Sequence, residues 1–205
     1  MKKLFAVGPD SSPTDTVAAL ARGVLVPFSK LAPPEGSESL PSFEQLYRRY
    51  FAFTWRTLRG LGIPPMSLDD AAQEVWIIVH RRLGEFEGRS TMKTWLFGIA
   101  VNVGRNLRRN DRQRRELVAL PLHLASPAPG PGEEREGHEA WQLVRGFVET
   151  LDQERREVFV CSLLEGLSAA DTAEATGLDV TTVYHRIRAL RRGLLRWAQR
   201  RKSTI

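Results

Sequence analysis

The sequence predicts an all-α protein with two helical domains joined by a flexible linker. Apolar residues recur at steps of three and four over residues 43–115 and again over residues 141–205, the spacing of helices with one buried face. Neither segment shows the strict apolar and polar alternation of a half-buried strand. Between them, residues 116–140 have the Pro, Gly and charge content of a linker.

Composition and charge narrow the class of protein. The 205 residues allow one or two domains with real cores, and a formal net charge of +6 suggests an anionic partner. The one cysteine, Cys161, excludes an intramolecular disulfide framework and a multi-cysteine metal site. Its apolar neighbours predict a buried thiol. The use of one cysteine fits a reducing cytoplasm. The apolar start is too short for a signal peptide and no stretch could span a membrane, so we expect a cytoplasmic protein without membrane insertion.

Residues 1–42 are rich in Pro, Ser and Gly and are predicted to form a flexible N-terminal extension. Within it, residues 15–31 can form an amphipathic helix, which we interpret as a candidate docking helix.

The first predicted domain, residues 43–115, has helix breaks at residues 60–65 and 84–90. The helix between these breaks is expected to begin at Ser67 or Asp69. Its second face carries Ile77, which is more apolar than a solvated face needs. Either this face binds a partner helix or Ile77 packs within the bundle. Catalysis and metal binding are disfavoured because no His or Cys stands at ligand spacing and nothing suggests a nucleophile.

The helix that ends this domain is strongly basic on one face. Six arginines lie between Arg105 and Arg115 against the single Asp111, which exceeds what solubility requires. Contacts with phosphates explain them best, because neutralised phosphates release counterions and strengthen binding. Asn102 and Trp95 share another side, where an amide can read base edges and an aromatic ring can stack, although a core position is the commoner fate of such a Trp.

The last domain, residues 141–205, contains a predicted helix-turn-helix. Ser168 can cap a first helix, Gly177 can end it in the left-handed conformation, and Asp179 can cap the second. The second helix has an apolar stripe and several arginines on its other faces, so it is expected to enter a DNA major groove. The stripe consists of Val183, Ile187, Leu190 and Leu194.

These motifs resemble a known family. DDAAQEVW followed by FEGRSTMKTWLFGIAVN is similar to conserved region 2 of the extracytoplasmic-function group of bacterial sigma-70 factors. LDQERREVFVCSLLEGLSAADTAEATGLDVTTVYHRIRALRRGL resembles region 4 of the same family. Both blocks stand in the family's order, separated by a linker of suitable character.

The resemblance implies three sets of contact residues. A docking site for the coiled coil of the polymerase beta-prime subunit would use Asp70, Gln73, Glu74 and Ile77. Contacts with the opened minus-10 element would use Phe86, Arg89, Ser90, Lys93, Trp95, Asn102, Arg105 and Arg109. Contacts with the minus-35 duplex would use Thr181, Thr182, Tyr184, His185, Arg186 and Arg188.

The sequence therefore predicts a sigma factor: a non-enzymatic initiation factor that binds core RNA polymerase and promoter DNA, with no cofactor, metal or catalytic residue. By resemblance, an anti-sigma factor is a further expected partner. The alternative is a stand-alone helix-turn-helix regulator with an N-terminal sensing or dimerisation bundle, which would bind promoters without polymerase. A helical nuclease or recombinase is a third hypothesis, disfavoured because the acidic residues are better explained by docking.

Overall fold

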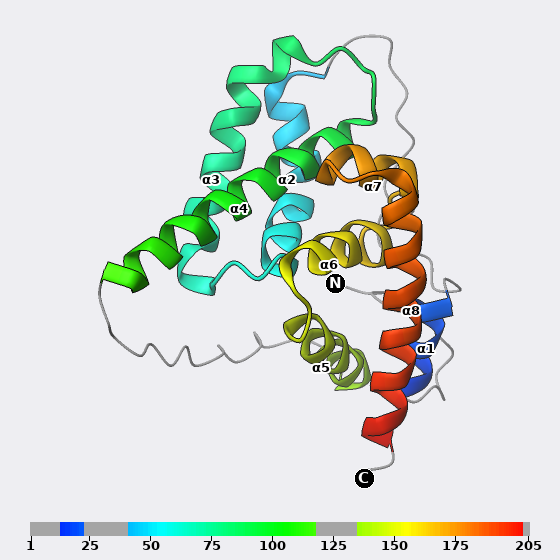
Figure 1. Cartoon of the computed structure of the whole chain (residues 1–205). Coiled ribbons are helices and arrows are strands. Elements are labelled where there is room, and N and C mark those ends of the chain that lie inside the picture. The colour runs from blue at the N-terminus through cyan, green and yellow to red at the C-terminus, as the bar shows by residue number, and fades with distance from the viewer. Residues whose placement is uncertain (1–12, 23–40, 118–134, 203–205) are drawn as a thin grey trace. The chain divides into compact units, whose positions relative to one another are not determined.

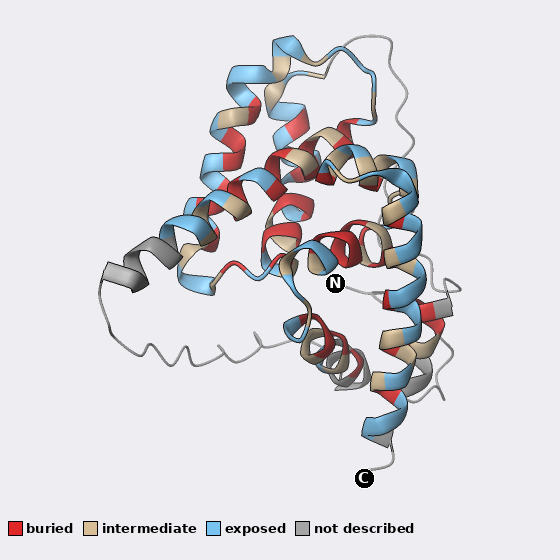
Figure 2. Cartoon of the chain, viewed as in Figure 1, coloured by how far each residue is buried: buried red, intermediate tan, exposed pale blue. Residues whose placement is uncertain are grey.

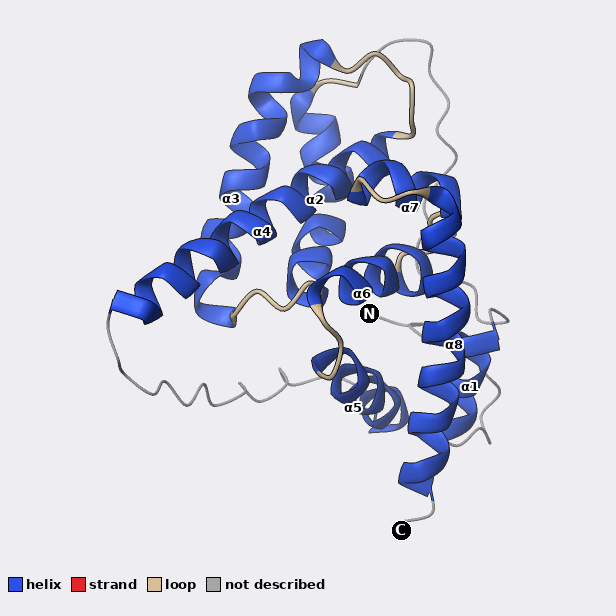
Figure 3. Ribbon diagram, in the orientation of Figure 1, coloured by secondary structure: helices blue, strands red, loops and turns tan. Residues whose placement is uncertain are grey.

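The computed structural model describes residues 13–22, 41–117 and 135–202 (Figure 1). Every regular element within these ranges is a helix, which confirms the predicted fold class (Figure 3). The helices cluster into two compact units. The first domain contains α2, α3 and α4, and the second contains α1, α5, α6, α8 and most of α7.

The first domain is a three-helix bundle of α2 (Phe43–Gly60), α3 (Pro65–Arg82) and α4 (Met92–Leu117). A capping box starts α2: the Gln45 backbone N–H donates to Ser42 Oγ (3.3 Å), and the Ser42 N–H donates to Gln45 Oε1 (3.0 Å). A short 3-10 turn, η2 (Leu83–Glu85), follows α3. Buried apolar residues from all three helices form the core, among them Leu46, Phe53, Leu58, Leu68, Val75, Val79, Leu96, Ile99, Ala100 and Val103.

The start of α3 differs from the prediction. The helix begins at Pro65, before Ser67 or Asp69, with Pro64 as the N-cap residue. Proline is favoured at the first helical position, because its missing N–H would have no intrahelical acceptor there and its φ is already helical. The Pro pair therefore marks the start of the helix as well as the end of the preceding turn.

The second domain is built on the long helix α8 (Val180–Lys202), with α5 (Arg135–Glu149), α6 (Gln153–Val158) and α7 (Ala169–Thr176). The helix α6 continues as a π-helical turn, η3 (Phe159–Leu164). Cys161 lies in this turn and is fully buried, as the sequence predicts. The Trp197 indole N–H donates to the backbone oxygen of Leu143 (3.1 Å) and so joins α8 to α5.

Three predicted boundaries differ from the helices observed. The amphipathic helix expected over residues 15–31 is α1 (Pro13–Arg22), and residues 23–31 lie outside the described residues. Residues 1–42 thus contain a helix, and α1 packs against α5 and α8. The linker predicted over residues 116–140 overlaps the end of α4 and the start of α5.

Gly177 offers a test of the turn between α7 and α8. Its φ of +72° is left-handed, and a Cβ there would meet nothing within 4 Å, so Gly177→Ala adds only backbone strain. We expect the second domain's free energy of unfolding to fall by about 1 to 2 kcal/mol, measured by denaturant titration followed through amide NMR signals. The matched control is Gly84→Ala, also without a Cβ contact within 4 Å and without a positive φ, which should change first-domain stability by less than about 0.5 kcal/mol. An equal, small effect of both substitutions would contradict the strained-turn account.

Candidate nucleic-acid and partner interfaces

Local side-chain caps fix the geometry of the helix-turn-helix. The Asp171 N–H donates to Ser168 Oγ (3.0 Å) at the start of α7, and Gly177 is the left-handed C-cap. The N–H groups of Thr181 and Thr182 donate to Asp179 Oδ1 (2.8 and 3.2 Å) at the start of α8. All three predicted caps are confirmed.

The cap of α8 is also an electrostatic feature. The backbone hydrogen bond from Thr182, and next the one from Thr181, lower the pKa of Asp179 below its ordinary value. Because the folded-state pKa is the lower one, the charged cap stabilises the fold above the carboxyl's unfolded pKa. This stabilisation is lost as the pH falls through the lowered folded pKa.

One face of α8 is free to meet a ligand and the opposite face holds the core. Val183, Leu190 and Leu194 of the predicted stripe are buried, and Ile187 is half-buried. Figure 2 shows buried and exposed positions following one another along α8. Of the predicted minus-35 residues, four are exposed and two, Thr182 and Arg186, are half-buried. The exposed four are Thr181, Tyr184, His185 and Arg188.

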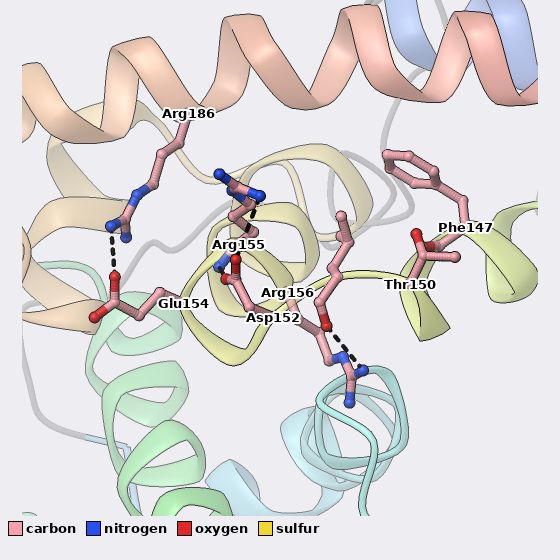
Figure 4. Close-up of polar contacts among 8 residues, drawn as sticks. Phe147, Thr150, Asp152, Glu154, Arg155, Arg156 and Arg186 are labelled. Carbon is pink, nitrogen blue, oxygen red and sulfur yellow. Dashed lines mark hydrogen bonds and ion pairs between the residues drawn. The ribbon is translucent and has the colours of Figure 1, made fainter.

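Arg186 has an internal partner that the sequence did not reveal. Its Nη2 donates to Glu154 Oε2 of α6 (2.5 Å), and its side chain is 25% exposed (Figure 4). Its Nη1 is buried and has no hydrogen-bond acceptor among the described residues. This arginine therefore joins α8 to α6. Arg188, two residues further along α8, is exposed.

The acidic face of α3 lies beside an aromatic groove. Asp70, Gln73, Glu74 and Ile77 are all exposed, and the 45% exposure of Ile77 rules out the alternative that it packs inside the bundle. Gln73 and Ile77 also line a groove of about 590 Å³ between α2 and α3. The other lining residues are Phe43, Tyr47, Phe51, Asp69, Ala72, Trp76, His80 and Arg81.

The aromatic wall of this groove belongs to α2, a helix to which the sequence assigned no site residue. The ring of Tyr47 lies 5.0 Å from that of Phe51 and 4.9 Å from that of Trp76 (centroid to centroid). Tyr47 and Phe51 are 39% and 37% exposed, which is unusual for large rings that already touch one another. Their spacing of four residues was a visible signal, but only the pairing of α2 with α3 sets them beside Ile77.

The predicted minus-10 residues lie on the η2–α4 loop and on α4. Phe86 and Trp95 pack on each other, with ring centroids 5.3 Å apart, and both are half-buried. Trp95 is thus not a core residue. Lys93 places its Nζ 5.1 Å from the centre of the Phe53 ring of α2.

The remaining candidates differ in exposure. Arg89 is exposed and pairs with Glu87, while Ser90 is half-buried. Asn102 and Arg109 are exposed on α4, the helix that also carries Arg105. The side chains of Arg112, Arg114 and Arg115, three of the six arginines of the predicted basic face, lie outside the described residues.

Two family models match the chain in order. The model described as Sigma-70 region 2 matches residues 46–115, and that described as Sigma-70, region 4 matches residues 141–194. The chain belongs to the sigma-70 family. Its curated relatives place it in the extracytoplasmic-function (ECF) group of that family.

Three relatives show how similar this sequence is to those of other sigma factors. The ECF RNA polymerase sigma factor SigC of Mycobacterium tuberculosis is 33% identical over 131 residues, covering 63% of this chain and 69% of the relative. The RNA polymerase sigma factor CnrH of Cupriavidus metallidurans is 29% identical over 165 residues, 77% of this chain and 86% of the relative. The ferric citrate uptake sigma factor FecI of Escherichia coli is 29% identical over 146 residues, 69% and 82% of the two chains.

Two solved structures share the fold of this sigma factor. CnrH in complex with the cytosolic domain of CnrY matches with a TM-score of 0.54 and 24% identity over 89% of this chain and 95% of that chain. The sigma factor RpoE of Bartonella quintana, in complex with the anti-sigma factor NepR, matches with a TM-score of 0.65 and 19% identity over 77% and 96%. In the described ranges, no helix of this sigma factor is both long and apolar enough to cross a bilayer.

The contact between Arg186 and Glu154 can be measured as a coupling. In a double-mutant cycle of Arg186→Ala and Glu154→Ala we expect about 0.5 to 1 kcal/mol of interaction energy in second-domain unfolding, because both side chains are partly solvated. The control cycle pairs Glu154→Ala with Arg188→Ala and should give a coupling near zero. Equal couplings in the two cycles would show that Arg186 does not anchor α8.

Proposed function

We propose that this protein is a transcription initiation factor that binds core RNA polymerase and directs it to promoters through their minus-10 and minus-35 elements. One observation carries the proposal: the region 2 and region 4 matches fall in order on two separate helical units, the second of which contains a capped helix-turn-helix. RNA synthesis itself would be catalysed by the polymerase, so this protein would be a non-enzymatic factor. It would act in the cytoplasm.

The minus-35 duplex would be met by the exposed side of α8. Its first two turns carry Thr181, Tyr184 and His185 outside the core, and Arg188 extends the same surface as a cation. Hydroxyl, imidazole and guanidinium groups can all donate to base edges or phosphates in a major groove. Because Arg186 is already bound by Glu154, we assign it mainly to orienting α8, with DNA contact as a secondary role.

The minus-10 element would be met by α4 and the loop before it. Exposed Asn102 and Arg109 supply an amide and a cation on one helix, while the packed pair of Phe86 and Trp95 supplies aromatic surface at its start. Stacking on such rings is largely independent of base identity and can offset the cost of unstacking a base from the duplex. Lys93, close to the Phe53 ring, would orient this end of α4 against α2.

Core polymerase would dock on the face of α3 and the adjoining groove. Asp70 and Glu74 offer negative charge, and Ile77 with the rings of Tyr47 and Phe51 offers apolar area. A charged rim around exposed aromatic residues is typical of protein interfaces whose binding energy is concentrated in a few large side chains. The beta-prime coiled coil is the partner we assign to this surface. An anti-sigma factor, such as the NepR of the Bartonella quintana complex, is proposed as a regulatory partner.

The direct test of function is run-off transcription with purified core polymerase on fragments of the source genome. We expect transcripts from a discrete set of promoters only when both the protein and the core enzyme are present. A protein that binds promoters tightly by itself, and leaves core-enzyme transcription unchanged, would instead be the stand-alone regulator considered above.

The groove provides a sharper test of docking. Tyr47→Ala together with Ile77→Ala, one residue from each wall, should weaken binding to core polymerase by about tenfold or more, because truncating an anchor residue typically costs more than 1 kcal/mol. The measurement is a fluorescence titration of labelled sigma factor with core enzyme.

The matched control for this titration is Met66→Ala. Met66 is 76% exposed on the same helix, α3, but does not line the groove, so its truncation should leave core affinity unchanged. Thermal unfolding of each variant shows whether the first domain has kept its fold. If the double substitution preserves both the fold and the full affinity, the groove is not the docking site.

A further inference from the structure

The N-terminal helix α1 lies in the hydrophobic core of the second domain, although α2–α4 separate the two in sequence. Val17, Leu20 and Ala21 are 0%, 6% and 2% exposed. They belong to the same cluster of buried residues as Val144 of α5 and Leu194 of α8. Figure 1 shows α1 (blue) beside α8 (red), in agreement with the contacts between these helices.

Helix α1 depends on this contact for its structure. It has ten residues, and isolated helices of that length are marginal in water because the first turn fixes several residues for a single hydrogen bond. The apolar side chains that it buries supply the missing stabilisation. Folding of α1 and docking of α1 are therefore one event.

The surface that receives α1 is organised by contacts of its own. Besides the hydrogen bond from Trp197 to Leu143, two glycines let α5 and α8 approach closely. A Cβ on Gly146 would lie 3.2 Å from Trp197 Cζ2, and one on Gly193 would lie 3.2 Å from Phe147 Cζ. Helices α5 and α8 are thus held together by contacts that do not involve α1, and the surface that they form is the seat of α1.

We propose that the apolar surface of α5 and α8 is a binding site for an amphipathic helix, and that in the free protein its occupant is α1 of the same chain. The chain then runs from the second domain through residues 23–41 to the first domain, and returns through residues 118–134. The two domains are thus linked twice: residues 118–134 join them covalently at all times, whereas residues 23–41 join them only while α1 is docked on the second domain.

This arrangement constrains the protein in a way that one linker does not. With α1 docked, residues 23–41 can extend over at most about 70 Å between the end of α1 and Ser42. A second connection of this kind confines the relative positions of the two domains and raises the effective concentration of one near the other. The proposal concerns the free protein and does not depend on which DNA or polymerase surface is used.

Amide hydrogen exchange on the full-length protein tests the proposal. In the parent protein, the amides of residues 17–22, whose intrahelical acceptors lie in the first turns of α1, should be protected. This protection should persist on dilution over about two orders of magnitude, because binding within one chain is independent of concentration. Val17→Asp with Leu20→Asp should accelerate exchange in α1 by about tenfold or more and leave α2–α4 unchanged. The matched control is Ala18→Ser, at a partly exposed position of the same helix, which should keep the protection.

Three results would overturn the proposal. Exchange of α1 in the parent at the rate of an unfolded segment would show that the helix is not docked. Protection that disappears on dilution would show that α1 binds a second copy of the chain, and protection that survives both Asp substitutions would show that its buried face does not hold it. If the Asp pair also abolishes protection in α5, the milder substitution Leu20→Ala takes its place. We then expect a smaller acceleration of exchange, confined to α1. Unchanged exchange in α1 of the Leu20→Ala variant would overturn the proposal.

Discussion

The apolar stripe of α8 is the contact on which the second domain depends. Val183, Leu190, Leu194 and Ala198 are all buried, and they pack in one cluster with residues of α1, α5, α6 and η3. Because the stripe fixes the rotation of the helix, it also decides which side chains face outward. The amphipathic pattern of α8 therefore determines two surfaces. One is the proposed DNA surface at its N-terminal end, and the other is the seat of α1 further along the helix.

The two domains differ in their excess of positive charge. The first carries 14 Lys or Arg against 7 Asp or Glu over residues 43–115, whereas the second carries 11 against 8 over residues 141–205. The weaker charge excess of the second domain predicts modest DNA affinity for region 4 by itself, since phosphate contacts dominate such affinity. We therefore propose that α8 would select the minus-35 site, whereas the basic first domain and the polymerase would supply much of the binding free energy.

Local chemistry explains what the sequence could predict. Ser168, Gly177 and Asp179 act on backbone groups within three or four residues of themselves, so their roles follow from order along the chain. The contacts that escaped prediction join distant segments. Glu154 and Arg186 are 32 residues apart, the aromatic wall of the groove comes from α2, and α1 packs against helices that follow more than a hundred residues later. Neither periodicity nor composition specifies such pairings, which arise from how the helices pack.

We propose that promoter recognition requires both domains and the polymerase together. Footprinting of a promoter fragment identified by run-off transcription tests it most directly, with the sigma factor alone, core polymerase alone, and both combined. We expect the combination to protect the minus-35 and minus-10 elements and the sigma factor alone to protect neither. Protection of either element by the sigma factor alone, without gain when core polymerase is added, would contradict it.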